Sequence, residues 1–492
     1  MSERPNILWF VADQMRCDTL HHMGNEASIT PNFDAIAEEG VSFENAYCQN
    51  PVCVPSRCSF LSGLYPHTTG HRTMHFLSNP DEPNIMRTMK NNGYEVVWIG
   101  RNDVVSGDRD KLEYCDYYFD GIHLDNQASS TSLKMIPDRV PFETPEVMEP
   151  LEPYAFYLGK LDKEKARNGQ DWTCVDSLLN YLEERQKEKG EKKPFFIYCT
   201  LFFPHPPYGC QEPWFSSIDR NNLMPRRTNV WELENKPSML YGISSKQRLK
   251  EWSEEKFNEL RATYLAMTSR FDYQFGTVCD ALKKHGLYDD TSIFVFSDHG
   301  DYTGDYGIVE KVQNCFEDTI CNVPLLVKPA KQFPVKPGIS KEIVELVDLP
   351  STIAEMAGIE LEYVQFGKSL VPTLNGAYHK GAAFCEGGRV HGEVQAMERG
   401  HGPQSPYWPR LDTQCSEGPE HTKACMIRMG NLKYTMRLYE LDELYDLEKD
   451  PYELNNIIND PAYAKVVNDM KLRMLQFYME TGDWVPNRKD KR

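Results

Sequence analysis

Residues 50–66 read Asn50-Pro51-Val52-Cys53-Val54-Pro55-Ser56-Arg57-Cys58-Ser59-Phe60-Leu61-Ser62-Gly63-Leu64-Tyr65-Pro66. No other stretch of the chain constrains its fold and chemistry as strongly. Pro55 has a fixed φ and no N–H to lose, so it suits the first turn of a helix, and residues 56–61 continue in helical register. We therefore expect Cys53 just before a helix N-terminus, where free N–H groups and the helix dipole favour an anion.

The pentapeptides 53–57 and 62–66 together resemble the signature of the type I sulfatases, a family of the alkaline phosphatase superfamily. In that family the cysteine of Cys-x-Pro-Ser-Arg is oxidised after synthesis to formylglycine, and the hydrate of this aldehyde is the nucleophile. The resemblance implies that Cys53 is catalytic once a formylglycine-generating or anaerobic sulfatase-maturing enzyme has oxidised it. It also implies that Arg57 steadies the hydrate through its fork of donors. A lone cysteine beside a proline is usually a small buried hydrophobe, but the fixed offsets of its neighbours favour the catalytic interpretation.

Four apolar runs of strand length each end in polar residues. The runs are Ile7–Ala12, Tyr94–Ile99, Phe195–Phe203 and Ser292–Phe296, and the helical stretches between them cover residues 32–39, 172–187 and about 245–285. Continuous apolar runs that alternate with helices predict an α/β fold with a large central mixed, mostly parallel sheet, flanked by helices. In such sheets ligands gather beyond the carboxyl ends of the strands.

A chain of 492 residues is long for a single core, so two domains are expected. We assign residues 1–375 to a catalytic α/β domain and residues 376–492 to a smaller C-terminal α+β subdomain. Short alternating runs after residue 420 predict an antiparallel sheet, and a terminal helix is expected near Tyr463–Glu480. The run 443–456 closely resembles a structural stretch of sulfatase C-terminal domains.

Composition excludes several classes of partner. The formal net charge is −19, from 54 basic and 73 acidic residues, which argues against a nucleic-acid partner. No stretch approaches the length of a transmembrane helix, and the run 6–12 is better interpreted as a buried strand than as a signal peptide. Fourteen cysteines without paired spacing favour reduced thiols, so we expect a cytoplasmic protein without a membrane partner. A small anionic substrate would then need a local basic pocket.

A metal site is implied by Asp298-His299-Gly300-Asp301, which follows an apolar run and resembles the Ser-Asp-His-Gly metal-binding segment of the superfamily. The resemblance implies a ligand set of Asp13, Gln14, residue 53 as formylglycine, Asp298 and His299. Mostly oxygen ligands suit Ca²⁺ or Mg²⁺ better than Zn²⁺, and both hard cations stay open. Either aspartate alone could equally be a helix cap at a strand-to-helix turn.

Two further residues match catalytic positions of the family. His205, in Phe203-Pro204-His205-Pro206-Pro207, matches the His-x-Pro segment that faces the ester oxygen, so we expect it to protonate the leaving alcohol. Lys311 matches the lysine that neutralises sulfate oxygens. A lone histidine is usually structural and most lysines are solvated, but the position of each after a motif favours the catalytic role.

The segment Gly100-Arg101-Asn102-Asp103 departs from the Gly-Lys-x-His found in many sulfatases. Arg101 keeps the cationic charge, whereas Asp103 stands where a histidine is usual. We interpret Arg101, Asn102 and Asp103 as substrate-binding residues, the last two through sugar hydroxyls. The alternative is that Asp103 only pairs with Arg101. His67, His71 and His75 follow the nucleophile helix, and for each singly the structural interpretation is preferred.

Three functions remain open, in order of preference. The first is a sulfatase that releases sulfate from a monoester, with a sulfated sugar from glycosaminoglycans as the substrate hypothesis. The second is a phosphonate monoester or phosphodiester hydrolase on the same scaffold. The third is a sulfated-glycan binder in which Cys53 is never oxidised. Loops 209–232 and 387–411, rich in Trp, Arg and His, are expected to frame the substrate.

Overall fold

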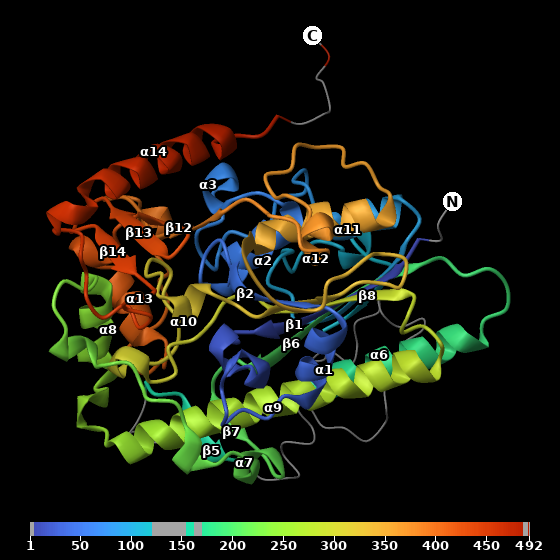
Figure 1. Ribbon diagram of the computed structural model, residues 1–492, viewed down its shortest axis with the longest axis horizontal. Coiled ribbons are helices and arrows are strands. Elements are labelled where there is room, and N and C mark those ends of the chain that lie inside the picture. The colour runs from blue at the N-terminus through green and yellow to red at the C-terminus, as the bar shows by residue number, and fades with distance from the viewer. Residues whose placement is uncertain (1–3, 121–153, 162–169, 486–490, 492) are drawn as a thin grey trace.

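The computed structural model describes residues 4–120, 154–161, 170–485 and 491, and it is built around one large sheet (Figure 1). The eight strands lie in the order β10-β2-β9-β8-β1-β6-β3-β4. Their bounds are β1 Asn6–Asp13, β2 Val41–Tyr47, β3 Glu95–Gly100, β4 Tyr117–Phe119, β6 Phe195–Pro204, β8 Thr291–Ser297, β9 Leu325–Lys328 and β10 Gly338–Glu345. Strand β9 is antiparallel to both neighbours, and all other pairs are parallel. The predicted mixed, mostly parallel sheet is confirmed.

Strand β1 lies in the middle of this sheet and is buried on both faces. Ile7, Trp9 and Val11 point to one hydrophobic cluster, and the alternating residues point to another. The first face is covered by α2 (Cys53–Ser62), α4 (Ile85–Asn91) and α11 (Leu349–Ala357). The opposite face is covered by α1 (Pro31–Glu39), α6 (Gln170–Lys187) and the long α9 (Glu254–Lys284). Figure 1 shows α6 and α9 together below the sheet, with α2 and α11 above it.

The helix bounds differ from the sequence prediction in two places. Helix α2 begins at Cys53 itself, one or two residues earlier than Pro55 suggested. The predicted helix over about 245–285 is wrong at its start, because Arg248 has a left-handed φ of 60° that ends α8 (Ser238–Gln247). Helix α9 then begins after Ser253, whose side chain accepts a hydrogen bond from the Lys256 N–H as an N-cap.

The C-terminal region forms the predicted antiparallel sheet with a helix packed on it. The strands are β11 (Ala382–Gly387), β12 (Ala424–Met429), β13 (Leu432–Arg437) and β14 (Glu443–Asp446), in that order. Helix α14 (Ala464–Thr481) covers this sheet, and Phe477 stacks on Phe384 with ring centroids 3.8 Å apart. The domain boundary at residues 375 and 376 stays a prediction.

The remaining described elements are short connections around these two sheets. They are α3 (Pro66–Thr69), β5 (Tyr157–Lys160), β7 (Tyr208–Cys210), α7 (Trp214–Ser217), α10 (Asp318–Cys321), α12 (Val371–Leu374) and α13 (Trp408–Gln414). Among the described residues, no helix combines the length and the apolar character that crossing a bilayer requires.

Candidate active site and metal centre

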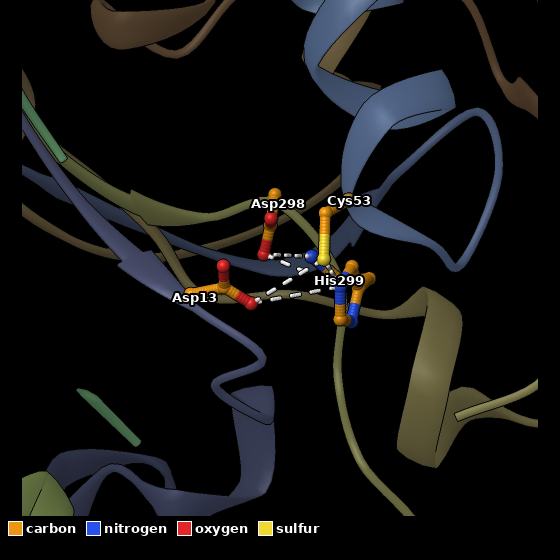
Figure 2. A group of neighbouring side chains, drawn as sticks. All are labelled: Asp13, Cys53, Asp298 and His299. Atoms are coloured by element: carbon orange, nitrogen blue, oxygen red, sulfur yellow. Dashed lines mark hydrogen bonds and ion pairs between the residues drawn. The ribbon is translucent and has the colours of Figure 1, made fainter. Parts of the chain in front are cut away.

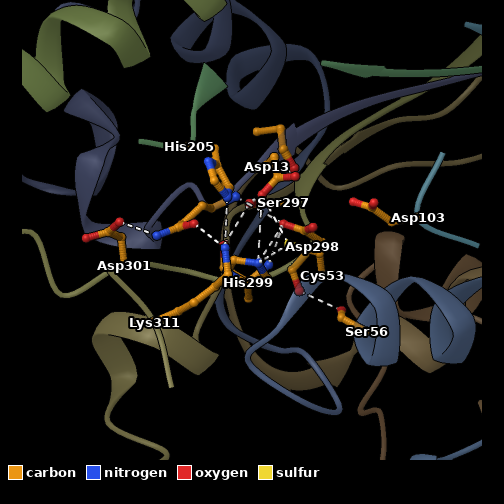
Figure 3. Close-up of polar contacts among 12 residues, drawn as sticks. Asp13, Cys53, Ser56, Asp103, His205, Ser297, Asp298, His299, Asp301 and Lys311 are labelled. Carbon is orange, nitrogen blue, oxygen red and sulfur yellow. Dashed lines mark hydrogen bonds and ion pairs between the residues drawn. The ribbon is translucent and has the colours of Figure 1, made fainter. Parts of the chain in front are cut away.

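The predicted site residues converge where four parallel strands of the large sheet end. Asp13 ends β1, Arg101 follows β3, His205 follows β6, and Asp298 follows β8. The N-terminus of α2 brings Cys53 to the same edge (Figures 2 and 3). This is the place where parallel sheets bind ligands, because helix N-termini and strand ends meet there.

Four fully buried side chains form a compact group that fits a metal ion (Figure 2). The ligand atoms of Asp13, Cys53, Asp298 and His299 lie within 4.8 Å of one another. Cys53 Sγ is 3.2 Å from His299 Nε2 and 3.6 Å from Asp13 Oδ1. His299 Nδ1 lies 2.9 Å from the Gly300 carbonyl and donates to it, so the lone pair of Nε2 is directed into the group. Two carboxylates and an imidazole nitrogen therefore surround the position of residue 53.

Arg57 connects the two carboxylates of this group. Its Nε donates to Asp298 Oδ2 at 2.9 Å and its Nη2 donates to Asp13 Oδ2 at 3.0 Å. Its Nη1 donates to the Thr200 hydroxyl on β6. Sequence analysis predicts that Arg57 steadies the hydrate at residue 53, whereas its contacts go to the carboxylates around that residue. Burial alone would raise the pKa of Asp13, but the neighbouring cations, led by Arg101, hold it below its usual value.

Gln14 lies beside the metal-binding group with both ends of its amide engaged. Its Oε1 accepts a hydrogen bond of 2.6 Å from Lys311 Nζ, and its Nε2 donates to Asp301. Its backbone carbonyl accepts from the Tyr264 hydroxyl. To ligate a metal through Oε1, as the resemblance implies, Gln14 would have to share that oxygen with Lys311 or turn away from it.

His205 and Lys311 form a hydrogen-bonded pair (Figure 3). His205 Nδ1 lies 2.6 Å from the Pro206 carbonyl and donates to it, so Nε2 is the acceptor for Lys311 Nζ at 3.0 Å. Burial, reinforced by the charge of Lys311, holds the pKa of His205 well below its usual value. Burial opposes the charge of Lys311, but Cys53 and Glu310 raise its pKa above the usual value. The histidine is therefore neutral and the lysine carries the proton.

Arg101 is held at the strand end by a glycine that cannot be replaced. Gly100 has a φ of 96°, and a Cβ there would lie 1.8 Å from the Thr200 carbonyl oxygen. The sharp turn directs Arg101 to Asp13, with Nη1 2.8 Å from Oδ2, and its guanidinium lies over the Phe202 ring. Arg101 therefore brings a partly exposed cation to the metal-binding group.

Asp103 and Asn102 both have partners within the protein. Asp103 Oδ2 lies 2.9 Å from Arg101 Nε and 3.8 Å from Arg57 Nε, which agrees with the alternative interpretation of an ion pair. Asn102 Oδ1 accepts from the backbone N–H groups of Val104 and Val105, and its Nδ2 donates to the Val105 carbonyl. Asn102 thus stabilises its own loop.

Arg410, on α13, was not singled out from the sequence, although it lies in the loop that was expected to frame the substrate. Its side chain is 8% exposed, and its nearest carboxylate oxygens are 3.7 Å away on Glu310 and 3.8 Å away on Glu398. Among the residues that the structure describes, none accepts a hydrogen bond from its Nε or Nη1. Burial opposes its charge, but Glu310 and Glu398, followed by Tyr407 and Cys53, raise the pKa of Arg410. A buried cation with unused donors therefore lies within electrostatic reach of residue 53.

Two of the histidines after the nucleophile helix are structural, as preferred. His67 Nδ1 lies 2.6 Å from Glu386, and His71 Nε2 lies 2.7 Å from Glu82. His75 is exposed.

The chain is similar to known proteins over almost its whole length. The family profile described as Sulfatase matches residues 5–359. The multifunctional alkaline phosphatase superfamily protein PehA of Trinickia caryophylli is 27% identical, over 98% of this chain and 96% of that protein. The phosphonate monoester hydrolase of Agrobacterium radiobacter has a TM-score of 0.72 and 21% identity, over 97% of this chain and 96% of that one. A protein solved in complex with its substrate D-glucosamine-2-N,6-O-disulfate has a TM-score of 0.70 and 20% identity, over 99% of this chain and all of that one.

Removing one carboxylate should empty the predicted metal centre. Asp298→Asn keeps the size of the side chain but removes a charge from the group, so we expect the purified protein to lose stoichiometric Ca²⁺ or Mg²⁺ in elemental analysis. Asp290→Asn is the matched control, since Asp290 precedes the same strand and pairs with Lys331 at the surface. Normal metal content in Asp298→Asn would contradict the ligand assignment.

Proposed function

Because this chain belongs to the sulfatase family and is thereby a hydrolase of sulfate esters, we propose that it releases sulfate from a monoester by means of formylglycine at residue 53 and a divalent cation. The proposal rests on the position of Cys53. Cys53 is the first residue of α2, is fully buried, and lies within 3.6 Å of both Asp13 and His299. A buried cysteine among metal-binding groups at a helix N-terminus is suited to an anionic substrate and not to packing alone.

The two groups that the family implies supply the bond-breaking chemistry. Formylglycine at residue 53 would supply, as its hydrate, a nucleophilic oxygen and a second hydroxyl that allows release of sulfate without a further nucleophile. A hard divalent cation, Ca²⁺ or Mg²⁺, supplies an electrophile at the sulfuryl oxygens, and Asp13, Asp298 and His299 with residue 53 would hold it. The net reaction consumes one water and yields the alcohol, sulfate and a proton.

The protein's own cations bind and orient the sulfate. Lys311 and Arg101 both carry charge beside Asp13, although the whole chain has a formal net charge of −19. Their donors are suited to sulfate oxygens, and Arg101 is partly exposed. Arg57 acts one step further away, because it fixes the two carboxylates that orient residue 53.

His205 and Lys311 are suited to protonate the departing alcohol together. In the resting arrangement Nε2 of His205 has no proton of its own, and Lys311 donates a hydrogen bond to it. Lys311 holds the proton of this pair, so we assign protonation of the ester oxygen to His205 Nε2 and Lys311 Nζ acting as one hydrogen-bonded unit, with the buried Glu310 3.0 Å from the lysine.

We further propose that the alcohol is a sugar carrying a second acidic group, such as a uronic acid or an additional sulfate. The N–H donors of Arg410 that have no partner among the described residues support this class. A carboxylate or sulfate group of the substrate could accept hydrogen bonds from two of these donors at once. A structural neighbour bound to a disulfated glucosamine is in line with the proposal. Since Asn102 is engaged in its own loop, we add Arg410 to the predicted sugar contacts.

Hydrolysis of phosphonate monoesters is the second candidate, because a relative is multifunctional and a solved neighbour is a phosphonate monoester hydrolase. The same charged groups would bind a phosphonate. Matched aryl sulfate and aryl phosphonate substrates separate the two, and a higher kcat/KM for the phosphonate would favour the second candidate.

We also propose that a maturing enzyme modifies Cys53 and that the protein works in the cytoplasm. Oxidation of Cys53 requires a formylglycine-generating or anaerobic sulfatase-maturing enzyme. All fourteen cysteines are free thiols, which supports work in the reducing cytoplasm.

Turnover should depend on an aldehyde at residue 53. We expect aldehyde labelling and peptide mass to identify formylglycine there, and activity to rise with the labelled fraction. Cys53→Ala should lose turnover about a thousandfold or more, because the nucleophile is removed. Cys58→Ala changes a second buried cysteine of the same helix and should keep both aldehyde and activity. Full activity in Cys53→Ala would refute the mechanism.

Loss of His205 should depend on the leaving group. Proton donation matters most for a poor leaving group, so His205→Ala should lower kcat/KM for an alkyl or sugar sulfate by about 10²–10⁴-fold. For nitrophenyl sulfate, whose leaving group needs little protonation, the loss should be below about tenfold. Equal losses on both substrates would instead indicate that His205 positions Lys311.

Arg410 should discriminate between substrates by their second acidic group. Arg410→Gln should lower kcat/KM for a sulfated uronate or disulfated sugar by about 10–100-fold, the value of one hydrogen bond to a charged group. The same variant should leave nitrophenyl sulfate within a few-fold. Arg399→Gln, an exposed arginine of the same segment, is the control. An equal effect of Arg410→Gln on all substrates would exclude this substrate class without touching the sulfatase assignment.

A further inference from the structure

A second group of metal-binding side chains lies in the connections of the C-terminal sheet. His391 follows β11, and Glu417 and His421 precede β12, with ligand atoms within 4.8 Å of one another. We propose that these three residues bind one borderline transition-metal cation, with Zn²⁺ as the biological candidate. The site is separate from the metal centre around residue 53 and uses none of its residues.

His421 gives independent evidence that a ligand belongs here. It is fully buried, yet within the described residues its ring nitrogens make no hydrogen bond of normal geometry and have only a looser contact with the Ser416 backbone. A buried polar group without a good partner is unfavourable, so such groups are rare unless something else satisfies them. The neighbouring ring of His391 lies edge-on to it, with centroids 4.8 Å apart. A cation between the two rings would give His421 the partner it lacks.

The other two ligands are held in orientations that suit this role. The His391 ring stacks on Tyr439 with centroids 3.7 Å apart, and the Tyr439 hydroxyl accepts from the His391 backbone N–H. Glu417 Oε2 lies 3.9 Å from His391 Nδ1, whereas Oε1 faces Arg389 Nη2 at 3.5 Å. One carboxylate oxygen is thus paired with the arginine, and the other is turned toward the histidines.

Small movements would complete the coordination. Ligand atoms around a tetrahedral Zn²⁺ lie about 3.3 Å apart, as follows from Zn–N distances of about 2.0 Å. The present separations exceed this by less than about 1.5 Å. The side chains of His391 and Glu417 are 49% and 57% exposed, so they can move while His421 stays fixed. The fourth position is left to water.

Ligand chemistry and charge set the metal and its affinity. Two imidazoles and one carboxylate favour Zn²⁺, Cu²⁺ or Ni²⁺ over Ca²⁺ and Mg²⁺, which prefer oxygen ligands alone. Arg389 offsets the charge of Glu417, so the group is close to neutral and the affinity should be micromolar. Arg389 also donates to the Ser416 carbonyl at 2.6 Å, which holds the turn that carries Glu417.

Such a cation would close the segment 392–416 at its two ends. One ligand precedes this segment and two follow it, and the segment carries Tyr407 and Arg410 to the active site. A link between its ends removes conformational freedom from the segment. The metal would therefore have a structural role: it would hold together the two ends of the segment 392–416.

Titration of untagged full-length protein with Zn²⁺ tests the site. Saturating Mg²⁺ and Ca²⁺ are present so that they fill the proposed metal centre around residue 53. We expect calorimetry to show one Zn²⁺ per chain with micromolar affinity. His391→Ala and Glu417→Gln change exposed residues and should each weaken binding roughly tenfold or more. His401→Ala removes another histidine of the same segment, whose Nδ1 lies 2.8 Å from the Ser405 hydroxyl, and should leave Zn²⁺ binding unchanged. Identical Zn²⁺ titrations of the wild type and His391→Ala would overturn the proposal.

Limited proteolysis tests the structural role of the metal directly. Zn²⁺ should slow cleavage within residues 392–416 several-fold in the wild type and in His401→Ala, but not in His391→Ala. Cleavage of the wild type at an unchanged rate under saturating Zn²⁺ would refute the structural role.

Discussion

The buried guanidinium of Arg57 between Asp13 and Asp298 is the interaction on which the rest of the site depends. These carboxylates end two adjacent parallel strands, and without a cation between them their burial and mutual repulsion would be strongly unfavourable. Arg57 lies one helical turn after Cys53 on α2, so the ion pairs that stabilise the carboxylates also fix the helix N-terminus against the sheet. The same ion pairs therefore stabilise the strand ends and fix the position of Cys53.

Several cations lie around this interaction, although the chain as a whole is strongly negative. A formal net charge of −19 repels an anionic ester at long range. Within the pocket, Arg101, Lys311 and Arg410 are held by carboxylates that each also contact another group. These cations are nearly fixed before substrate arrives, so binding a sulfate requires little reorganisation. Screening by salt weakens the long-range repulsion far more than the buried pocket, because exposed charges are the ones that ions shield.

Sequence reasoning predicted the sheet, the flanking helices and the convergence of Cys53, Asp13, Asp298 and His205, because period, strand length and motif spacing are local properties. It could not predict the partners of these side chains. The amide of Gln14 meets Lys311 across 297 residues of sequence, and that contact determines what the amide can do. Asn102 stays a predicted sugar contact, but its hydrogen bonds are to its own loop, two and three residues away, a pattern that a polar residue in a motif does not reveal. Arg410 carried no local signal beyond its place in an unmatched loop.

The large sheet and the small C-terminal sheet position different groups of the candidate site. The large sheet positions the residues around Cys53. The backbone at its strand ends is tightly constrained, since a Cβ at Gly100 would lie 1.8 Å from the Thr200 carbonyl oxygen. The connection between β11 and β12 of the small sheet supplies Tyr407 and Arg410, whose positions depend on a long segment and not on a strand. Changes in that segment can alter the alcohol that is accepted while the bond-breaking groups stay in place. On the substrate class proposed above, the segment 387–421 would set which alcohol is accepted, and whatever anchors the ends of that segment would then bear on specificity as well.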